Sequence, residues 1–242
     1  EGGVTAAVLC DAIVRGFKKA DARFVEEASR NEWMDGSTAI MLALSSLELI
    51  VANLGDSRAV LGVVEKGQGG GMVVDPVALS RDHKPDDPDE LERIEAAGGL
   101  VLERYGSGIP RVMGVLAVSR AMGDAQLKPY VSSCPEVMSL PRADNQWFAV
   151  LASDGLWDVF TNQEAADFLL QAMLDLSPDC GAKALAIAAH RRGSLDNISV
   201  LVIDLRKRDW VPHTARSDTP DVTASVPDVT KDFVTKDLRT SA

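Results

Sequence analysis

Two carboxylates stand at the ends of two apolar stretches, where their oxygen atoms could serve chemistry on a charged substrate. The apolar run 147–152 stops at a Ser-Asp-Gly turn, which places Asp154 where a buried strand would leave the core. A second run, 198–203, is preceded by Asp196. If the two strands pair antiparallel, the end of the first lies beside the start of the second. Both carboxylates would then meet at one edge of one sheet.

A divalent cation would relieve the repulsion between these carboxylates. Hard oxygen ligands without paired cysteine or histidine residues favour magnesium or manganese over zinc. Asp158 follows Asp154 by four residues, and Asp124 stands at the end of another apolar run. Because aspartate and glycine dominate ordinary turns, each of these positions taken alone also has a purely structural interpretation.

The composition is that of an ordinary globular protein and excludes some classes of partner. The chain has 242 residues, of which 46% are hydrophobic and 25% are charged. Its net charge of -11 argues against nucleic acid or an anionic membrane as the main partner, and no apolar run is long enough to span a membrane. Cys10, Cys134 and Cys180 form neither a metal-binding spacing nor a disulfide framework. A reducing compartment, the cytoplasm or the nucleus or both, is therefore expected.

The elements that precede the carboxylates begin with a helix. Apolar residues at spacings of three and four predict an amphipathic helix over 5–29. Three strands with short links follow, over 38–44, 47–53 and 58–62, and they predict an antiparallel meander. The glycine-rich stretch 68–71 lacks the Lys-Ser/Thr of a P-loop, and we interpret it as a hairpin tip.

The middle of the chain predicts a short helix and two strands. Asp87 at the cap and Pro88 at the first helical position begin the helix, and Gly98 ends it. Strands are predicted over 100–103 and 111–118.

Two helices separate the central strand from the Asp196 strand. A capping box over 161–164 opens the first, and Ser-Pro at 177–178 opens the second, which ends near Gly193. From about residue 207 to the end of the sequence, Ser, Thr, Pro and Asp predominate. We therefore expect a globular domain over 1–207 and a disordered tail over 208–242.

The three histidines show no ligand spacing, and none is assigned to catalysis. His83 is expected in a loop and His190 on the surface of a helix, and His213 falls in the tail. The sequence contains no Gly-x-Ser-x-Gly elbow and no Rossmann fingerprint.

Seven short segments, in one order between about residues 35 and 205, carry a family resemblance. They are Asp35-Gly-Ser-Thr-Ala39, Ala52-Asn-Leu-Gly-Asp-Ser-Arg-Ala-Val60, Leu79-Ser-Arg-Asp-His-Lys-Pro85, Arg93-Ile-Glu-Ala-Ala-Gly-Gly99, Leu116-Ala-Val-Ser-Arg-Ala-Met-Gly-Asp124, Ala152-Ser-Asp-Gly-Leu-Trp-Asp158 and Ser194-Leu-Asp-Asn-Ile-Ser-Val200. Together they resemble the metal-dependent serine/threonine protein phosphatases of type 2C, in particular plant members.

The resemblance implies a fold, a cofactor and a reaction. The implied fold class is α+β, an antiparallel β-sandwich with helices packed on both outer faces. Two Mg²⁺ or Mn²⁺ ions would activate a water for the hydrolysis of phosphoserine and phosphothreonine, and an additional metal would be held more weakly. Asp154 and Asp196 match family metal ligands, and Asp124 and Asp158 match positions linked to the additional metal. Trp157 is expected to pack beneath the metal loop.

One family segment has no counterpart here. The family carries Asp-Gly-His-Gly before its first long helix, whereas the two Asp-Gly pairs of this chain, at Asp35 and Asp154, are not followed by histidine. The resemblance therefore implies that the N-terminal strands are missing from the chain, which begins at Glu1, and that the chain alone has little or no activity.

Two main hypotheses remain open. The first is a phosphatase acting on phosphoproteins, monomeric and regulated by a protein kinase or a receptor. The second is a catalytically dead, phosphatase-like module that binds a kinase or another phosphoprotein. A metallohydrolase of another class is a more distant third.

Overall fold

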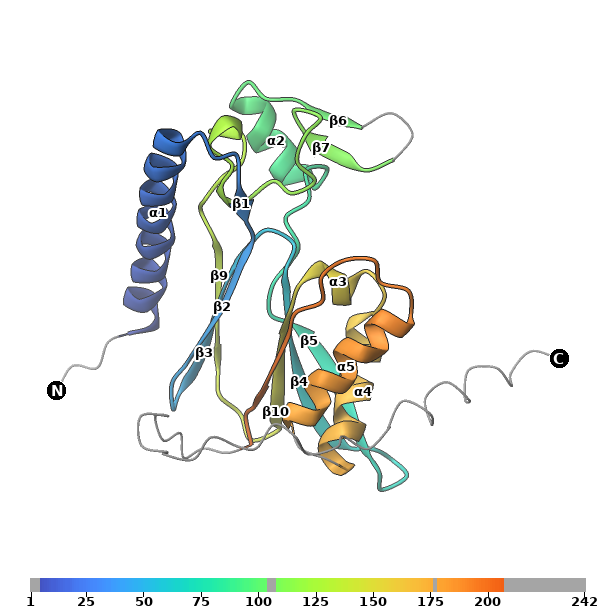
Figure 1. Cartoon of the computed structure of the whole chain (residues 1–242). Helices are drawn as coiled ribbons and strands as arrows, with labels where there is room; N and C mark the ends of the chain where they lie inside the picture. The colour runs from blue at the N-terminus through green and yellow to red at the C-terminus, as the bar shows by residue number, and fades with distance from the viewer. Residues whose placement is uncertain (1–4, 104–107, 176–177, 207–242) are drawn as a thin grey trace. The chain divides into compact units, whose positions relative to one another are not determined.

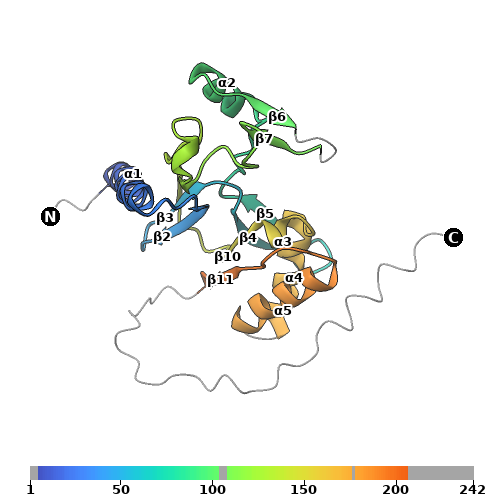
Figure 2. The same ribbon diagram turned by 45° about the horizontal axis from the view of Figure 1, so that its top comes forward.

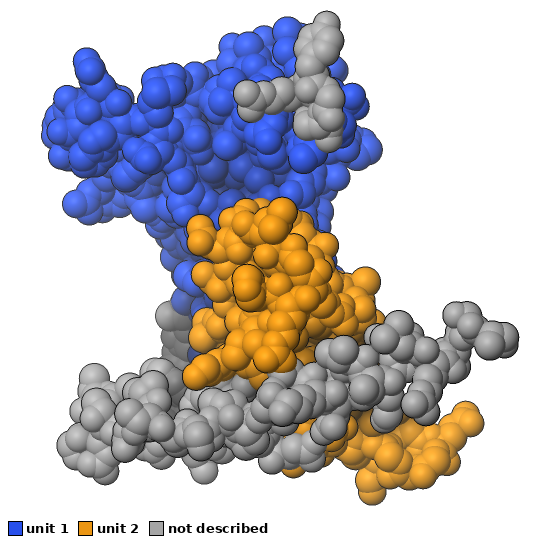
Figure 3. Space-filling view, turned by 45° about the vertical axis from the view of Figure 1, so that its right-hand side comes forward, with its two compact units in different colours: residues 1–60, 78–143 blue, residues 61–77, 144–242 orange. Residues whose placement is uncertain are grey.

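The structure is a computed structural model that describes residues 5–103, 108–175 and 178–206. The chain divides into two compact units (Figure 3). Unit 1 comprises residues 1–60 and 78–143, and unit 2 comprises residues 61–77 and 144–242. The proposed tail over 208–242 lies outside the described residues. One phosphatase domain over 1–207 stays a prediction.

Unit 1 begins with the predicted amphipathic helix, α1 (Ala6–Asn31), shown in blue in Figure 1. Thr5 is its N-cap, and the side chain of Thr5 accepts the N–H of Val8. The helix ends at Glu32, whose left-handed backbone lets its N–H bond to the carbonyl of Ala28. The helix packs against strands of the same unit, which buries Ala28.

The sheet of unit 1 is antiparallel and contains three strands, in the order β2 (Ala39–Leu44), β3 (Glu48–Leu54) and β9 (Glu136–Pro141). The predicted hairpin between β2 and β3 is confirmed, because Ser45 closes the turn with its N–H on the carbonyl of Glu48. A separate two-stranded pairing joins β1 (Gly36–Ser37) to β8 (Met122–Gly123).

The predicted meander is wrong at its third strand. β4 (Arg58–Lys66) does not pair with β3 but lies between β10 and β5 in the other sheet. The free edge of β3 is taken by β9 instead. Gly55, with φ of 101°, turns the chain between the two strands, and a side chain there would meet Thr38 at 2.4 Å.

A small subregion of unit 1 contains α2 (Pro88–Ala96) and the pair β6 (Val101–Glu103) and β7 (Pro110–Val112). Asp87 stands at the helix cap as predicted, but its carboxylate accepts the N–H of Lys84 and makes no cap bond.

The predicted strand over 111–118 is wrong beyond Val112. Met113 and Gly114 have positive φ, and the N–H of Gly114 bonds back to the carbonyl of Arg111. This tight turn folds Leu116 onto Val112 as an isolated bridge, so the apolar run is used as a turn and not as an extended strand.

Unit 2 is built on a four-stranded sheet with the order β11 (Val200–Asp204), β10 (Gln146–Ala152), β4 and β5 (Met72–Ala78). The glycine-rich stretch closes the link from β4 to β5, as predicted, with the N–H of Gly67 on the carbonyl of Gly71. Close packing inside this sheet requires a glycine at Gly62, where a Cβ would lie 2.3 Å from the ring of Phe148.

Two helices accompany this sheet, α4 (Asn162–Asp175) and α5 (Pro178–Arg191), and α5 packs against β11 (Figure 2). The predicted capping box opens α4, because Thr161 donates its N–H to Glu164 and accepts the N–H of Glu164 at 3.2 Å. The predicted cap at 177 lies outside the described residues.

The predicted fold class, α+β with antiparallel sheets and packed helices, is confirmed. Each unit buries its own apolar side chains, including Leu54 in unit 1 and Phe148 in unit 2. Within the part of the chain that the structure describes, no helix is long and apolar enough to cross a membrane.

Candidate metal site

The two carboxylate-bearing loops of unit 2 are neighbours, as the sequence predicts. β10 and β11 are antiparallel, and Ala152 at the end of β10 lies opposite Val200 at the start of β11. Asp154 then begins the short helix α3 (Asp154–Trp157). The loop that precedes β11 carries Asp196. The two loops therefore leave the sheet at the same edge.

Hydrogen bonds join these loops beyond the last strand pair. The hydroxyl of Ser153 donates to the carbonyl of Asn197 at 3.0 Å and accepts the N–H of Ser199 at 3.0 Å. The hydroxyl of Ser194 donates to the carbonyl of Gly155 at 2.7 Å. Each loop thus binds the backbone of the other.

Gly155 is required by this close approach. A Cβ at this position would lie 2.4 Å from the carbonyl oxygen of Asn197, so any side chain would push the loops apart. Trp157 supports the turn from below as predicted: its side chain is buried and its indole N–H donates to the carbonyl of Ala152 at 3.0 Å.

The carboxylates of unit 2 differ in exposure. Asp154 is half-buried, whereas Asp158 and Asp196 are exposed. Asp158 is the C-cap of α3, and its backbone N–H donates to the carbonyl of Asp154. The carboxylate of Asp196 accepts the N–H of Asn197 at 2.6 Å. Among residues 5–103, 108–175 and 178–206, no three Asp, Glu, His or Cys side chains converge into a set that could hold a metal ion.

Asp124 lies in unit 1, at the end of β8, with a left-handed backbone at φ of 48°. Its carboxylate lies over Gly36, where an added Cβ would meet Oδ2 at 1.8 Å. Burial raises the pKa of Asp124 above its usual value. Lys128 opposes this shift, while Asp21 and Asp35 raise the pKa further. This corner of unit 1 is therefore rich in carboxyl groups.

The structure also places a buried ion network in unit 1 that the sequence did not predict. Glu90 on α2 is 1% exposed and binds Arg120 through the Nε of that arginine at 3.0 Å and Arg93 at 2.8 Å. Although burial opposes ionisation, hydrogen bonds from Arg120 and Arg93 lower the pKa of Glu90 to about 2. No sequence signal joins Glu90 to Arg120, because 30 residues separate them.

His83 belongs to the same region and lies in a loop, as predicted, but its side chain is completely buried. Its Nδ1 lies 3.1 Å from the N–H of Gly55, and its Nε2 lies 3.2 Å from a carboxylate oxygen of Glu136. Burial lowers the pKa of His83 below its usual value, and the charge of Arg120 lowers it further. This histidine therefore serves packing, and His190 is exposed as predicted.

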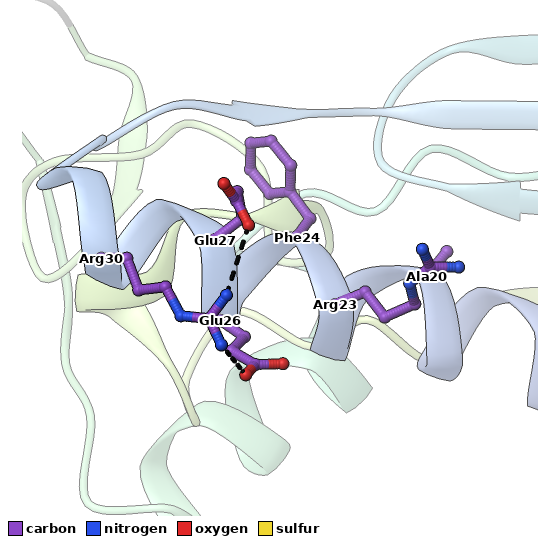
Figure 4. A pocket seen from close by; sticks show the side chains of 6 residues that line it. All are labelled: Ala20, Arg23, Phe24, Glu26, Glu27 and Arg30. Atoms are coloured by element: carbon purple, nitrogen blue, oxygen red, sulfur yellow. Dashed lines mark hydrogen bonds and ion pairs between the residues drawn. The ribbon is translucent and has the colours of Figure 1, made fainter.

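An open depression on α1 is chemically different from the carboxylate loops. Arg30 lies 3.6 Å from Glu27 and also pairs with Glu26, so these three charged side chains pair within the helix (Figure 4). None of the predicted site residues lines it. The lining residues are Ala20, Arg23, Phe24, Glu26, Glu27 and Arg30.

The joined loops fit part of a magnesium or manganese site. Asp154 and Asp196 offer hard oxygen atoms, and Mg²⁺ is commonly held by one or two carboxylates while it keeps several waters. The remaining carboxylates of the described residues do not complete a set of three. The assignment of Asp154, Asp196, Asp124 and Asp158 as metal ligands therefore stays a prediction.

The chain is similar in sequence and in fold to known proteins. The family described as Protein phosphatase 2C matches residues 4–198. Probable protein phosphatase 2C 68 of Oryza sativa subsp. japonica is 49% identical over 175 residues, which cover 71% of this chain and 46% of that protein. Probable protein phosphatase 2C 59 of Arabidopsis thaliana is 44% identical over 199 residues, covering 82% of this chain and 58% of that protein. The chain spans about half the length of these relatives.

Solved structures of similar fold include a serine-threonine phosphatase 2C from Toxoplasma gondii. It has a TM-score of 0.72 and 28% identity, and the match covers 84% of this chain and 71% of that one. A C. elegans sex determining protein has a TM-score of 0.73 and 28% identity, covering 85% and 49% of the two chains. The family match, the plant relatives and these folds agree, and the chain belongs to the protein phosphatase 2C family.

Proposed function

We propose that this chain supplies metal-binding loops of a protein serine/threonine phosphatase that hydrolyses phosphoserine and phosphothreonine in phosphoproteins. The observation that carries the proposal is the pair of hydrogen-bonded loops that bring Asp154 and Asp196 to one sheet edge. Family membership and hard oxygen donors support Mg²⁺ or Mn²⁺ as the cofactor.

Different residues of the chain would bind the metal and position the loops. Asp154 and Asp196 of unit 2 would hold a divalent cation. Asp158 in that unit and Asp124 in unit 1 each stay a proposed ligand of an additional ion. When bound, such an ion lowers the pKa of a coordinated water, so that hydroxide is available near neutral pH. The hydrogen bonds between the loops keep the two carboxylate positions together, and Trp157 fixes the turn from below.

We further propose that the chain by itself is weakly active or inactive. The support is that the described carboxylates do not form a set of three around one point, and that neither Asp-Gly pair is followed by histidine. A phosphoprotein is the proposed substrate, and a kinase or receptor is the proposed regulator of a monomeric enzyme. The dispersed cysteines favour the cytoplasm or the nucleus.

The experiment compares this chain with a fusion in which an Asp-Gly-His-Gly segment of a plant relative precedes it. Both are assayed with p-nitrophenyl phosphate and millimolar Mn²⁺, beside D154N versions. We expect activity in the fusion, its loss in the D154N fusion, and little activity in the chain alone.

Other outcomes would change the proposal in defined ways. Equal activity in both proteins would contradict the need for the additional segment. Activity that survives D154N would remove the assigned metal site. A folded but silent fusion would favour the alternative, a phosphatase-like module that binds a kinase or another phosphoprotein.

A further inference from the structure

Two serine side chains bracket the two aspartates of the candidate metal site. Ser153 directly precedes Asp154, and Ser194 stands two residues before Asp196. We infer that Ser153 and Ser194 are positioning residues, which hold together the two loops that present Asp154 and Asp196 to a divalent cation. This inference rests on the proposed function and assigns a role to two side chains that bind no metal themselves.

The hydrogen bonds of the two serines are reciprocal. Ser153 belongs to the loop after β10 and donates to the carbonyl of Asn197, in the loop before β11. Ser194 belongs to that second loop and donates to the carbonyl of Gly155 in the first. Ser153 and Gly155 flank Asp154 in the sequence, and Ser194 and Asn197 flank Asp196. Moving the backbone of either aspartate away from the other loop would therefore break one of these bonds.

These bonds begin where the regular sheet ends. The ladder between β10 and β11 stops at Ala152 and Val200. Past that point, the contact of Ser153 with Asn197 and Ser199 and the bond from Ser194 to Gly155 hold the loops together. One backbone bond, from the N–H of Ser153 to the carbonyl of Ser199 at 3.1 Å, continues past the ladder, and the hydroxyl bonds add the contacts to Asn197 and Gly155.

The surroundings make the bond from Ser194 hard to replace. Ser194 is 7% exposed, and Gly155 is buried, so water has little access to the carbonyl of Gly155 if the hydroxyl is lost. Groups that orient metal ligands without touching the metal commonly change metal affinity by about 10–100-fold when they are removed. We expect an effect of that size here.

The test measures Mn²⁺ binding to the full chain, which needs no catalytic activity. The electron paramagnetic resonance signal of free hydrated Mn²⁺ is followed as protein is added, and the D154N and D196N variants define the binding that belongs to this site. We expect S153A and S194A each to weaken that binding about 10-fold. S153T keeps the hydroxyl at a half-buried position and should restore binding to within about 3-fold of the original.

A matched control separates positioning from general destabilisation. Thr161 makes a comparable hydroxyl contact in the same unit, at the cap of α4, and its loss should lower the stability of the fold. T161A should therefore melt at a lower temperature yet bind Mn²⁺ as the unchanged chain does. Melting curves of S153A and S194A show whether their loss of stability is similar to that of T161A.

Each result decides the inference. Mn²⁺ binding that is sensitive to D154N and D196N but unchanged in S153A and S194A would overturn it and leave the proposed function standing. Equal weakening in T161A, or no recovery in S153T, would also overturn it, because the serines would then act only through stability. If neither D154N nor D196N changes Mn²⁺ binding, the assigned metal site fails, and the inference fails with it.

Discussion

Glu90 and Asp124 are acidic side chains of unit 1, the first buried and the second half-buried. The charged neighbours of Glu90 are arginines, whereas those of Asp124 include two further aspartates. Glu90 is held by Arg93 and Arg120, which keep its pKa at about 2 despite its burial. Asp124 faces Asp21 and Asp35, with Lys128 as an opposing cation, and its pKa is raised. A buried carboxylate with two guanidinium partners is stabilising scaffolding, whereas one among other carboxyl groups is typical of a functional site.

The largest expected effect is the loss of the Glu90 charge. E90Q leaves the half-buried Arg93 and Arg120 without their buried anion, and we expect the free energy of unfolding to fall by about 3 kcal/mol. Urea denaturation followed by circular dichroism measures this. E92Q is the matched control, because Glu92 is exposed on the same helix. If E90Q and E92Q unfold alike, the network contributes nothing to the fold.

The second prediction concerns acid. The folded pKa of Glu90 lies near 2, below its ordinary value of 4.5, so the unfolded chain binds more protons between these values. The stability that ionised Glu90 contributes is complete above about pH 4.5 and is lost as the pH falls towards 2. Unfolding free energies across this range should decline less steeply in E90Q than in the unchanged chain. The E92Q control should keep the original slope.

A smaller loss is expected at the cation beside Asp124. Lys128 lies 3.3 Å from Asp21 and donates to the carbonyl of Ala121 at 3.0 Å. K128Q should lower the free energy of unfolding by about 1.5 kcal/mol, because charged hydrogen bonds are lost and the carboxyl groups repel one another more strongly. K19Q, at an exposed position of α1, should change it little. Identical unfolding of the two variants would mean that Lys128 does not neutralise this corner.

The smallest effect has the opposite sign and tests the comparison most directly. D124N removes one of three neighbouring carboxylates, and in the presence of a chelator at pH 7 it should raise the free energy of unfolding by at most about 1 kcal/mol, since solvent screens a half-buried charge. D75N, at an exposed site of β5, provides the control. A loss of stability in D124N would show that Asp124 is structural in the way that Glu90 is.

Local signals in the sequence were sufficient for much of the fold. The helix α1 follows from apolar spacing, the start of α4 from its capping box, and the β2–β3 hairpin from two apolar runs with a short link. These features depend on residues a few positions apart. The strand predicted over 111–118 was wrong because the run is apolar but Met113 and Gly114 adopt turn geometry, which hydrophobicity does not report.

Some features of the candidate site could be predicted from the sequence, and others could not. Turn residues at the ends of apolar runs, together with the family motifs, predicted where Asp154 and Asp196 leave the sheet, but not which group would approach Gly155. The approaching group, the carbonyl of Asn197, was visible only in the fold. The hydroxyl bonds of Ser153 and Ser194 were equally unpredictable, since serine is common in every turn.

The amino-acid sequence by itself determined the longer helices, the places where the carboxylate-bearing loops leave the sheet, and the family, because these depend on periodicity, turn chemistry and short motifs. Only the tertiary structure decided that β4 leaves β3 for the other sheet, that Glu90 meets Arg120, and that His83 is buried. The physical reason is that these outcomes depend on which distant segments share one space. Competition for strand edges and the pairing of buried charges settle that only when the chain has folded.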